Sequence, residues 1–238
     1  MTKKQLEDLL SEDWCDKILN YITIEEVNKI SSTINKDREK YTVIPSKGSD
    51  LFFKAFRVTP YNSLKICILG QDIYHTIDEN GNYIYDGLAF SNSNSLKPQP
   101  SLKNILTESI KDCPEGDFPN DLDELNLYRW ARQGVLLINS AHTVRQSSPG
   151  IHIKLWKPFT EAVMKAINEK DDIIHMQWGK FAQSYSKFIT NPSHFLIKTS
   201  HPSPLGYDKP APIPFKGSQC FLKANEQLTA RNKMEIKW

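Results

Sequence analysis

The sequence predicts an α/β fold: a single domain with a central four-stranded parallel sheet and helices on both faces. Four short apolar runs are typical of buried strands, namely residues 65–69, 135–138, 173–176 and 195–199. Helical patterns lie between them, and strands that alternate with helices pair in parallel and are covered on both faces. Polar or aromatic residues follow each run directly, and ligands bind at this edge of open α/β sheets.

We expect one domain over residues 1–238, because the chain contains no internal repeat and no low-complexity linker. A chain of 238 residues is long enough to bury a sizeable core. Leu6 and Leu10 belong to an apolar pattern with helical spacing over residues 3 to about 34. Residues 1–40 are therefore predicted to form a helical N-terminal part that packs on the domain.

Five further helices are predicted from apolar periodicity. Ser101 stands at the start of one of them, where its hydroxyl would serve as the N-cap. Two others fill the connections between the later strands, as parallel pairing requires. The predicted ranges are 51–56, 101–111, 156–169, 179–189 and 217–229.

Composition limits the class of protein and its compartment. The formal net charge is +2 and the pI about 8.2, so any basic surface must come from local clustering of charge. The four cysteines form no CxxC pair, which argues against a zinc site and favours a reducing, intracellular compartment, cytoplasmic or nuclear according to the host. No apolar run approaches the ~18 residues of a membrane span, and the first residues lack an apolar signal core. We therefore expect no targeting segment, no membrane association and no metal.

Three polar residues at strand ends could share one site. Asp72 follows the first strand, where a carboxylate could activate water or stabilise a developing positive charge, although capping of a turn is equally consistent. Asn139 carries the amide donor and acceptor that read a planar ring edge, but a lone Asn is more often a turn residue. His201 stands between Ser200 and Pro202 on a backbone stiffened by the two prolines that follow within three residues, and a lone His is more often structural. Phe90, taken alone, would be assigned to the core.

Six short segments form a series along the chain. They are Gly70–His75, Gly87–Ser91, Pro100–Leu102, Trp130–Arg145, Trp178-Gly179 with Ala182-Gln183, and His201–Leu205. In this order and at these strand ends, they resemble the motifs of the family-1 uracil-DNA glycosylases over about residues 14–228. One such match would be weak, whereas six in order are very specific. Within the first motif, Ile73 stands where the family has proline.

The resemblance implies an enzyme that flips uracil out of DNA and hydrolyses its N-glycosidic bond, the first step of base excision repair. Free uracil and an abasic site are the products, and flipping costs about a few kcal/mol. The implied catalytic residues are Asp72, which positions water and offsets the cationic sugar, and His201, a neutral ring that donates to uracil O2. His75 would help to organise the water.

Uracil-binding residues are implied by the same resemblance. Phe90 would stack on the flipped base. Asn139 would accept from N3–H and donate to O4, and Tyr74 would press against C5 and exclude the methyl group of thymine. The backbone N–H groups of Gln71 and Asp72 would face a uracil oxygen.

The resemblance also implies a DNA-binding surface. Leu205 resembles the family's wedge, which enters the base stack from the minor groove. Ser101 and Ser203 resemble serines that hold phosphates. Two other family serines are replaced: Lys180 could supply a charge contact, whereas Gly206 can offer only its N–H.

Two loops are longer than we expect for the family. In residues 76–86, Asn80-Gly81 predicts a tight hairpin, which we favour as a solvated elaboration over a DNA contact. In residues 206–214, three prolines predict a stiff, extended segment that brings Lys209 to a DNA phosphate; an arch into solvent is the alternative. Ile73 frees φ beside the catalytic carboxylate and could lower the rate modestly.

Two other functions would use the same fold differently. A catalytically silent DNA-binding module would not need Asp72, Asn139 and His201 together. A relative acting on thymine or xanthine is disfavoured by Tyr74 and Asn139, which together select uracil. The implied partners are uracil-containing DNA, single- or double-stranded, and a proteinaceous uracil-glycosylase inhibitor, with the protein acting as a monomer without a cofactor.

Overall fold

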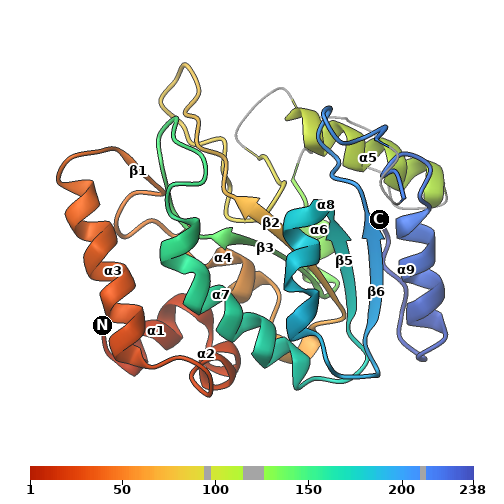
Figure 1. Cartoon of the computed structure of the whole chain (residues 1–238), viewed down its shortest axis with the longest axis horizontal. Coiled ribbons are helices and arrows are strands. Elements are labelled where there is room, and N and C mark those ends of the chain that lie inside the picture. Colours follow the sequence, from red (N-terminus) through yellow and green to blue (C-terminus); the bar gives the residue numbers. More distant parts are fainter. Residues whose placement is uncertain (94–97, 115–125, 210–212) are drawn as a thin grey trace.

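The centre of the structure is a sheet of four strands in the order β3-β2-β5-β6 (Figure 1). All neighbouring pairs are parallel, so the carboxyl ends of the four strands meet at one edge. β3 and β5 are buried along their whole length, as expected for strands covered on both faces. The fold class predicted from the sequence is confirmed. The strands are β2 (Ile66–Asp72), β3 (Val135–Ala141), β5 (Ile174–Trp178) and β6 (Phe195–Thr199).

This computed structural model describes residues 1–93, 98–114, 126–209 and 213–238. Within these ranges, a second, two-stranded sheet pairs β1 (Val43–Ile44) with β4 (Val144–Arg145) in antiparallel fashion. The sequence analysis does not predict this sheet, because two-residue strands carry no readable periodicity.

Two strands of the central sheet continue beyond their apolar runs. Gly70 pairs with Asn139, and Asp72 pairs with Ala141. Polar residues can extend the strands in this way because the hydrogen bonds of a sheet join backbone N–H and C=O groups, not side chains. The prediction that Asp72 and Asn139 follow their strands is therefore wrong in this detail. Both residues belong to the sheet, which fixes their backbones.

The N-terminal part consists of three helices rather than one continuous pattern. Thr2 and Thr23 each start a helix with a capping box, and the first helix ends at Ser11, where φ is 126°. The buried side chains of these helices join the same hydrophobic core as the sheet. Their ranges are α1 (Lys3–Leu10), α2 (Glu12–Ile18) and α3 (Ile24–Arg38).

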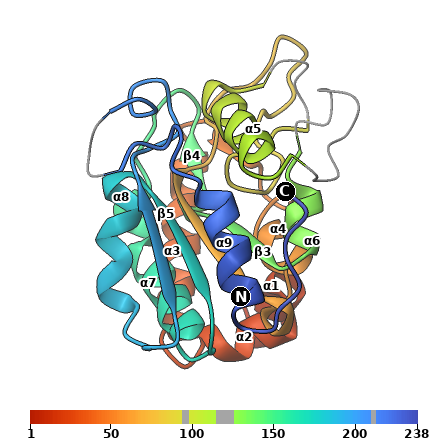
Figure 2. The same cartoon turned by 90° about the vertical axis from the view of Figure 1, so that its right-hand side faces the viewer.

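The remaining helices cover both faces of the sheet. The five that the sequence predicts lie close to their ranges, whereas α6 and η1 are missed, because segments of five and three residues carry little periodicity. α7 and α8 pack on one face, and α6 and α9 pack on the other (Figure 2). The predicted 179–189 helix divides into α8 and a 3₁₀ helix, η2. The ranges are α4 (Lys54–Val58), η1 (Tyr61–Ser63), α5 (Pro100–Asp112), α6 (Tyr128–Arg132), α7 (Ile153–Asn168), α8 (Gly179–Gln183), η2 (Ser184–Phe188) and α9 (Cys220–Thr229).

The predicted N-cap at Ser101 is wrong. α5 begins at Pro100, and Gln99 is its N-cap residue. Proline is favoured at the first helical position because its missing N–H would have no intrahelical partner there. Ser101 therefore lies within the first turn of α5. In the part of the chain that the structure describes, no helix is long and apolar enough to cross a bilayer.

Two histidines are buried in the core and form no ion pair with a described residue. His142 packs edge-on against the rings of Phe53, Trp156 and Phe159. His175 on β5 lies 3.0 Å from His194, Nε2 to Nδ1. Burial lowers the pKa of both His142 and His175 from 6.5 to about 3.

We predict that acid destabilises the fold through these two rings. Because their pKa values are lower in the folded state, the unfolded chain takes up protons first as the pH falls below about 6.5, and stability is lost progressively towards pH 3. Each ring contributes a slope of about 1.4 kcal/mol per pH unit in that window. Urea denaturation at several pH values should give a shallower slope for His142→Phe and for His175→Gln. Slopes equal to the wild type in both variants would exclude this origin.

Candidate active site

A cavity of about 230 Å³ opens at the carboxyl edge of the sheet. It brings together seven residues that the sequence analysis assigns to the site, contributed by β2, β3, α5 and the loops after β2 and β6. Tyr85 and Leu88 also line it and are absent from that assignment. The complete lining is Gln71, Asp72, Tyr74, Tyr85, Leu88, Phe90, Ser101, Asn139 and His201.

Asp72 closes β2 and directs a partly buried carboxylate into the cavity. Burial raises its pKa, while the Gly150 backbone amide, the Gln71 side chain and the nearby imidazoles of His75 and His152 oppose this effect. Its Oδ1 is buried and accepts no hydrogen bond from any described residue, so an unsatisfied acceptor lies at the edge of the cavity.

Asn139 lies beside Gly70 in the parallel ladder, and the two residues depend on each other. A Cβ atom at position 70 would lie 2.4 Å from the Asn139 Oδ1, so only glycine leaves room for this side chain. Asn139 is 5% exposed, and its amide makes no hydrogen bond with a described residue. Both its donor and its acceptor can therefore pair with the edge of a planar ring.

His201 is held as a neutral ring with a defined tautomer. The Ser203 backbone N–H donates to Nδ1 over 3.0 Å, so this nitrogen carries no proton and Nε2 carries one. Burial lowers the pKa of His201, which also favours the neutral form. Gly179 and Gly206 pack closely on it: a Cβ at Gly206 would lie 2.6 Å from the His201 carbonyl oxygen.

Phe90 forms an aromatic wall of the cavity and adopts φ 65°, which is uncommon for a bulky residue. Its ring lies 5.3 Å from that of Trp178 and 6.0 Å from that of His201. The Tyr74 hydroxyl donates to the Phe90 carbonyl over 3.1 Å. Tyr74 and Phe90 are thus joined in one rigid wall.

Asp86 fixes the loop that carries Phe90, and the sequence analysis does not assign it to the site. Its carboxylate accepts from the hydroxyls of Ser91 (2.6 Å) and Ser93 (2.7 Å) and from the Leu88 N–H (3.2 Å). Asp86 is 3% exposed, and burial raises its pKa although these hydrogen bonds oppose the shift. An aspartate beside Gly87 in the sequence is typical of a turn, so only the fold reveals this role.

Leu205 projects from the rim of the cavity with 80% of its surface exposed. Its loop is tightly turned, because the N–H groups of Gly206 and Tyr207 both donate to the Ser203 carbonyl over 2.8 Å. The buried Glu108 on α5 anchors the loop further by accepting from the Tyr207 hydroxyl over 2.5 Å. A rigid loop thus carries an exposed apolar side chain.

These turns correct two predictions for the 206–214 loop. Gly206 does not offer a free N–H, because that group is bonded to Ser203. The segment after Leu205 is turned rather than extended as far as Lys209, whose N–H donates to the Gly206 carbonyl. Residues 210–212, which include two of the prolines, lie outside the described residues.

The remaining assigned residues lie around the cavity rather than in it. Lys180 on α8 and Lys209 are exposed, and neither forms an ion pair with a described residue. Ser203 follows the His201 loop, which Asn104 of α5 fastens by donating to the Pro202 carbonyl over 2.8 Å. His75 does not line the cavity; its Nδ1 is buried without a partner among the described residues.

The segment between His75 and Asp86 contains the predicted hairpin. Ile77 and Tyr83 form an antiparallel bridge, and the Asp78 carboxylate accepts from the N–H groups of Asn80 and Asn82. Ile73 is 1% exposed and packs in a small apolar cluster with Ile44 and Val144. This packing restrains the position where the family has proline.

Within the described ranges, no three His, Cys, Asp or Glu side chains come together in a metal-binding group. A carboxylate and a neutral imidazole instead flank a slot with an aromatic wall and one free amide. Such a slot, at the carboxyl edge of a parallel sheet, has the groups that a hydrolytic enzyme acting on a compound with a planar ring would need.

Comparisons with known proteins show the family to which the chain belongs. The model of the uracil DNA glycosylase superfamily matches residues 56–229. The uracil-DNA glycosylase of Deinococcus radiodurans is 35% identical over 96% of this chain and 87% of its own length, and that of Bacillus cereus G9842 is 37% identical over 98% of each. The crystal structure of mimivirus uracil-DNA glycosylase matches with a TM-score of 0.87 and 28% identity, over 100% of this chain and 89% of that one.

This chain belongs to the uracil-DNA glycosylases, the DNA repair hydrolases that release uracil from DNA by cleaving its N-glycosidic bond. The resemblance drawn from the sequence motifs is thereby confirmed. The family acts on DNA.

We predict that Asp86 positions Phe90 for base stacking. Asp86→Ala leaves the Ser91 and Ser93 hydroxyls without their acceptor, so KM for uracil-DNA should rise by about tenfold, the effect of one lost base–aromatic stack, with a smaller fall in kcat. Asp86→Asn keeps one acceptor oxygen, so its KM should lie between that of the wild type and that of Asp86→Ala. Steady-state kinetics measure KM and kcat for these variants. Asp8→Asn, the same change at an exposed position on α1, is the control. A fall in kcat alone, with KM unchanged, would contradict the positioning role.

Proposed function

We propose that this pocket binds a uracil flipped out of DNA, and that some of its residues recognise the base while others promote hydrolysis of the N-glycosidic bond. The observation that carries the proposal is the free Asn139 amide beside the Phe90 ring and the fixed His201 tautomer. Uracil offers a flat face, an N3–H donor and two carbonyl acceptors, and each finds a counterpart among these groups. The Gln71 and Asp72 N–H groups would serve a uracil oxygen.

Recognition of uracil rests on two contacts in this proposal. Asn139 accepts from N3–H and donates to O4, whereas cytosine presents an acceptor and a donor in those places. Tyr74, restrained by its bond to the Phe90 carbonyl, presses against C5 and leaves no room for the methyl group of thymine. Phe90 stacks on the base.

Hydrolysis breaks the bond between sugar C1′ and uracil N1 and forms a bond between C1′ and a water oxygen. His201 donates from Nε2–H to uracil O2, which gains negative charge as the base leaves. Asp72 stabilises the positive charge on the sugar and orients the water, whose proton it can accept, and His75 helps to orient that water.

In this proposal, one apolar, two hydroxyl and two cationic side chains bind the DNA on both sides of the uracil. Leu205 enters the space left by the flipped base, which costs least when its loop is already rigid. Ser101 and Ser203 bind phosphates, and Lys180 and Lys209 add charge contacts. Single- and double-stranded DNA both serve as substrate.

Two further properties complete the proposal. Variants of the mimivirus enzyme have been crystallised in complex with UGI, which supports a proteinaceous uracil-glycosylase inhibitor as a partner of this chain. The four cysteines form no disulfide, which accords with a monomer in a reducing compartment, cytoplasmic or nuclear.

The mechanism predicts that Asp72→Asn and His201→Leu each lower turnover by about 10²–10³, while binding of uracil-DNA largely survives. Single-turnover cleavage of an oligonucleotide with one uracil measures the rate, with thymine and abasic oligonucleotides as controls. Rates within about threefold of wild type for both variants would contradict the assigned roles, since a true transition-state contact contributes far more.

Specificity gives a separate prediction. Asn139→Asp should gain detectable cytosine excision, because a protonated carboxyl group can donate to the ring while its other oxygen accepts from the exocyclic amine. Tyr74→Ala should admit thymine by opening the space at C5. The same gel assay, with oligonucleotides carrying one cytosine or one thymine opposite guanine or adenine, reads both outcomes. Variants that stay fully active and specific for uracil would show that the base sits otherwise in the pocket.

The DNA grip predicts different effects for Leu205 and Lys209. Leu205→Ala should impair excision from duplex more than from single strands, where less stacking must be replaced. Lys209→Ala should weaken binding evenly across sequences and lower the log–log salt slope by about 0.9, the effect of one lost phosphate contact. An unchanged salt slope would mean that Lys209 faces solvent in the complex.

A further inference from the structure

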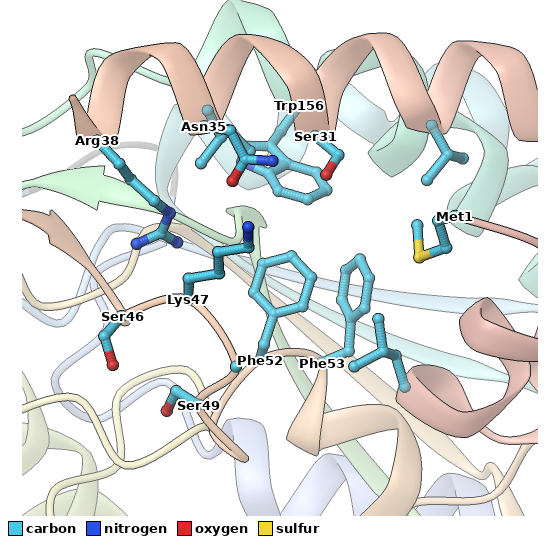
Figure 3. A pocket seen from close by; sticks show the side chains of 14 residues that line it. Met1, Ser31, Asn35, Arg38, Ser46, Lys47, Ser49, Phe52, Phe53 and Trp156 are labelled. Atoms are coloured by element: carbon cyan, nitrogen blue, oxygen red, sulfur yellow. The ribbon is translucent and has the colours of Figure 1, made fainter.

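A second cavity, of about 280 Å³, lies between α3 and the segment 46–53, and it shares no lining residue with the uracil pocket. Figure 3 shows α3 along one side and the rings of Phe52 and Phe53 opposite. Met1 lies at one end of the opening, and Arg38 and Lys47 lie at the other. The mechanism of uracil excision makes no use of this cavity.

One side of the cavity is aromatic. The Phe52 ring lies 4.3 Å from the Phe53 ring and 5.7 Å from the Trp156 ring, centroid to centroid. Phe53 adopts φ 55°, a left-handed conformation that is a genuine outlier for a bulky side chain. Strain of this kind persists where the surrounding structure enforces it, and it clusters at ligand sites.

The opposite side presents polar groups along α3. Ser31, Asn35 and Arg38 follow one another at the i, i+4 and i+7 spacing of one helix face. The side chains of Ser31 and Asn35 make no hydrogen bond with any described residue. They are therefore free to bond to a molecule in the cavity.

The charged side chains among the described lining residues of the cavity are all positive. Arg38 donates to the carbonyls of Val43 (3.0 Å) and Pro45 (2.8 Å), which leaves further guanidinium donors unused. Neither Arg38 nor Lys47 forms an ion pair within the described residues, and no carboxylate lines the cavity. Burial lowers the pKa of Arg38, yet its guanidinium stays charged, so a positive charge is partly desolvated here without a countercharge.

The cavity walls are held in place without a ligand. Arg57 on α4 donates to the Phe52 carbonyl over 2.9 Å and also bonds to the Leu9 carbonyl. Arg38 fixes the other end of the same segment through Val43 and Pro45. A preformed site spends little binding free energy on ordering itself.

We propose that this cavity binds a compact amphipathic monoanion: a flat apolar body against Phe52 and Trp156, with a carboxylate at the Arg38–Lys47 end and one polar group facing Ser31 or Asn35. A carboxylate is the planar partner that a guanidinium with free donors recognises best. The volume of 280 Å³ lies just below the usual range of small-molecule sites, about 300–1,000 Å³, which restricts the ligand to a small one.

Indole-3-acetate is a suitable probe, and its neutral isostere indole-3-acetamide is the matched control ligand. Titration calorimetry and saturation-transfer NMR on the full chain should show that the acid binds at least about tenfold more tightly than the amide, the factor expected from one charge-assisted contact. Equal affinity for the two, or no binding of either, would overturn the proposal.

Variants locate the site. Lys47→Gln and Arg38→Gln should each weaken binding of the acid while leaving the amide unchanged. Arg38→Lys should restore only part of the affinity, because lysine lacks the planar fork. Lys36→Gln, an equal charge change at an exposed position of the same helix, should have no effect. Ser31→Trp should fill the cavity and abolish binding of both ligands.

Two outcomes would decide against the cavity. One is an effect of Lys36→Gln as large as that of Lys47→Gln, which would indicate attraction by overall charge. The other is undiminished binding to a folded Ser31→Trp variant. Lys47 is exposed, so Lys47→Gln remains informative if Arg38→Gln loses its carbonyl contacts and unfolds. Uracil excision by Lys47→Gln should equal that of the wild type. The ligand proposal and the proposed catalytic roles are therefore tested independently of each other.

Discussion

The close parallel pairing of β2 with β3 is the constraint on which the site depends. Gly70 and Asn139 are direct partners in this ladder, and the absence of a Cβ at position 70 leaves the space that the Asn139 amide occupies. The same ladder carries Asp72 two residues further along, beside Ala141. The carboxylate and the amide are therefore spaced by backbone hydrogen bonds rather than by flexible loops. A site built on strands holds its geometry more closely than one built on loops alone.

The loops that complete the site are held by hydrogen bonds from groups outside it. The Ser203 N–H sets the tautomer of His201, Asp86 gathers the hydroxyls that shape the Phe90 loop, and Glu108 anchors the turn behind Leu205. Asp86 is buried and forms no ion pair with a described residue. Donated hydrogen bonds stabilise its carboxylate instead, an arrangement that costs desolvation but fixes the direction of the side chain. The supporting residues thus determine where the reacting groups lie.

Much of this could be predicted from the sequence, because apolar runs and short motifs are local signals. The four runs predicted the strands, and seven of the predicted residues line one cavity. The failures share a different cause. The extension of β2 through Asp72, the burial of Asp86 and the loss of a free N–H at Gly206 all depend on partners distant in the chain or on turn geometry. Local patterns carry no information about such partners. The prediction of Ser101 as a cap is wrong because Pro100 occupies the first position of α5.

Polar groups in the pocket that lack hydrogen-bond partners among the described residues lower the stability of the folded protein. The Asp72 Oδ1 is buried and unbonded among the described residues, and the Asn139 amide is nearly buried and equally free. A buried polar group without a partner costs about 1–3 kcal/mol. Replacement of either side chain by an apolar one of similar shape should therefore stabilise the fold. It would also remove the proposed contact of Asp72 with water or of Asn139 with the base. In the proposed function, this cost is recovered when uracil and water occupy the pocket, and the free groups that weaken the empty protein would then select the ring that satisfies them.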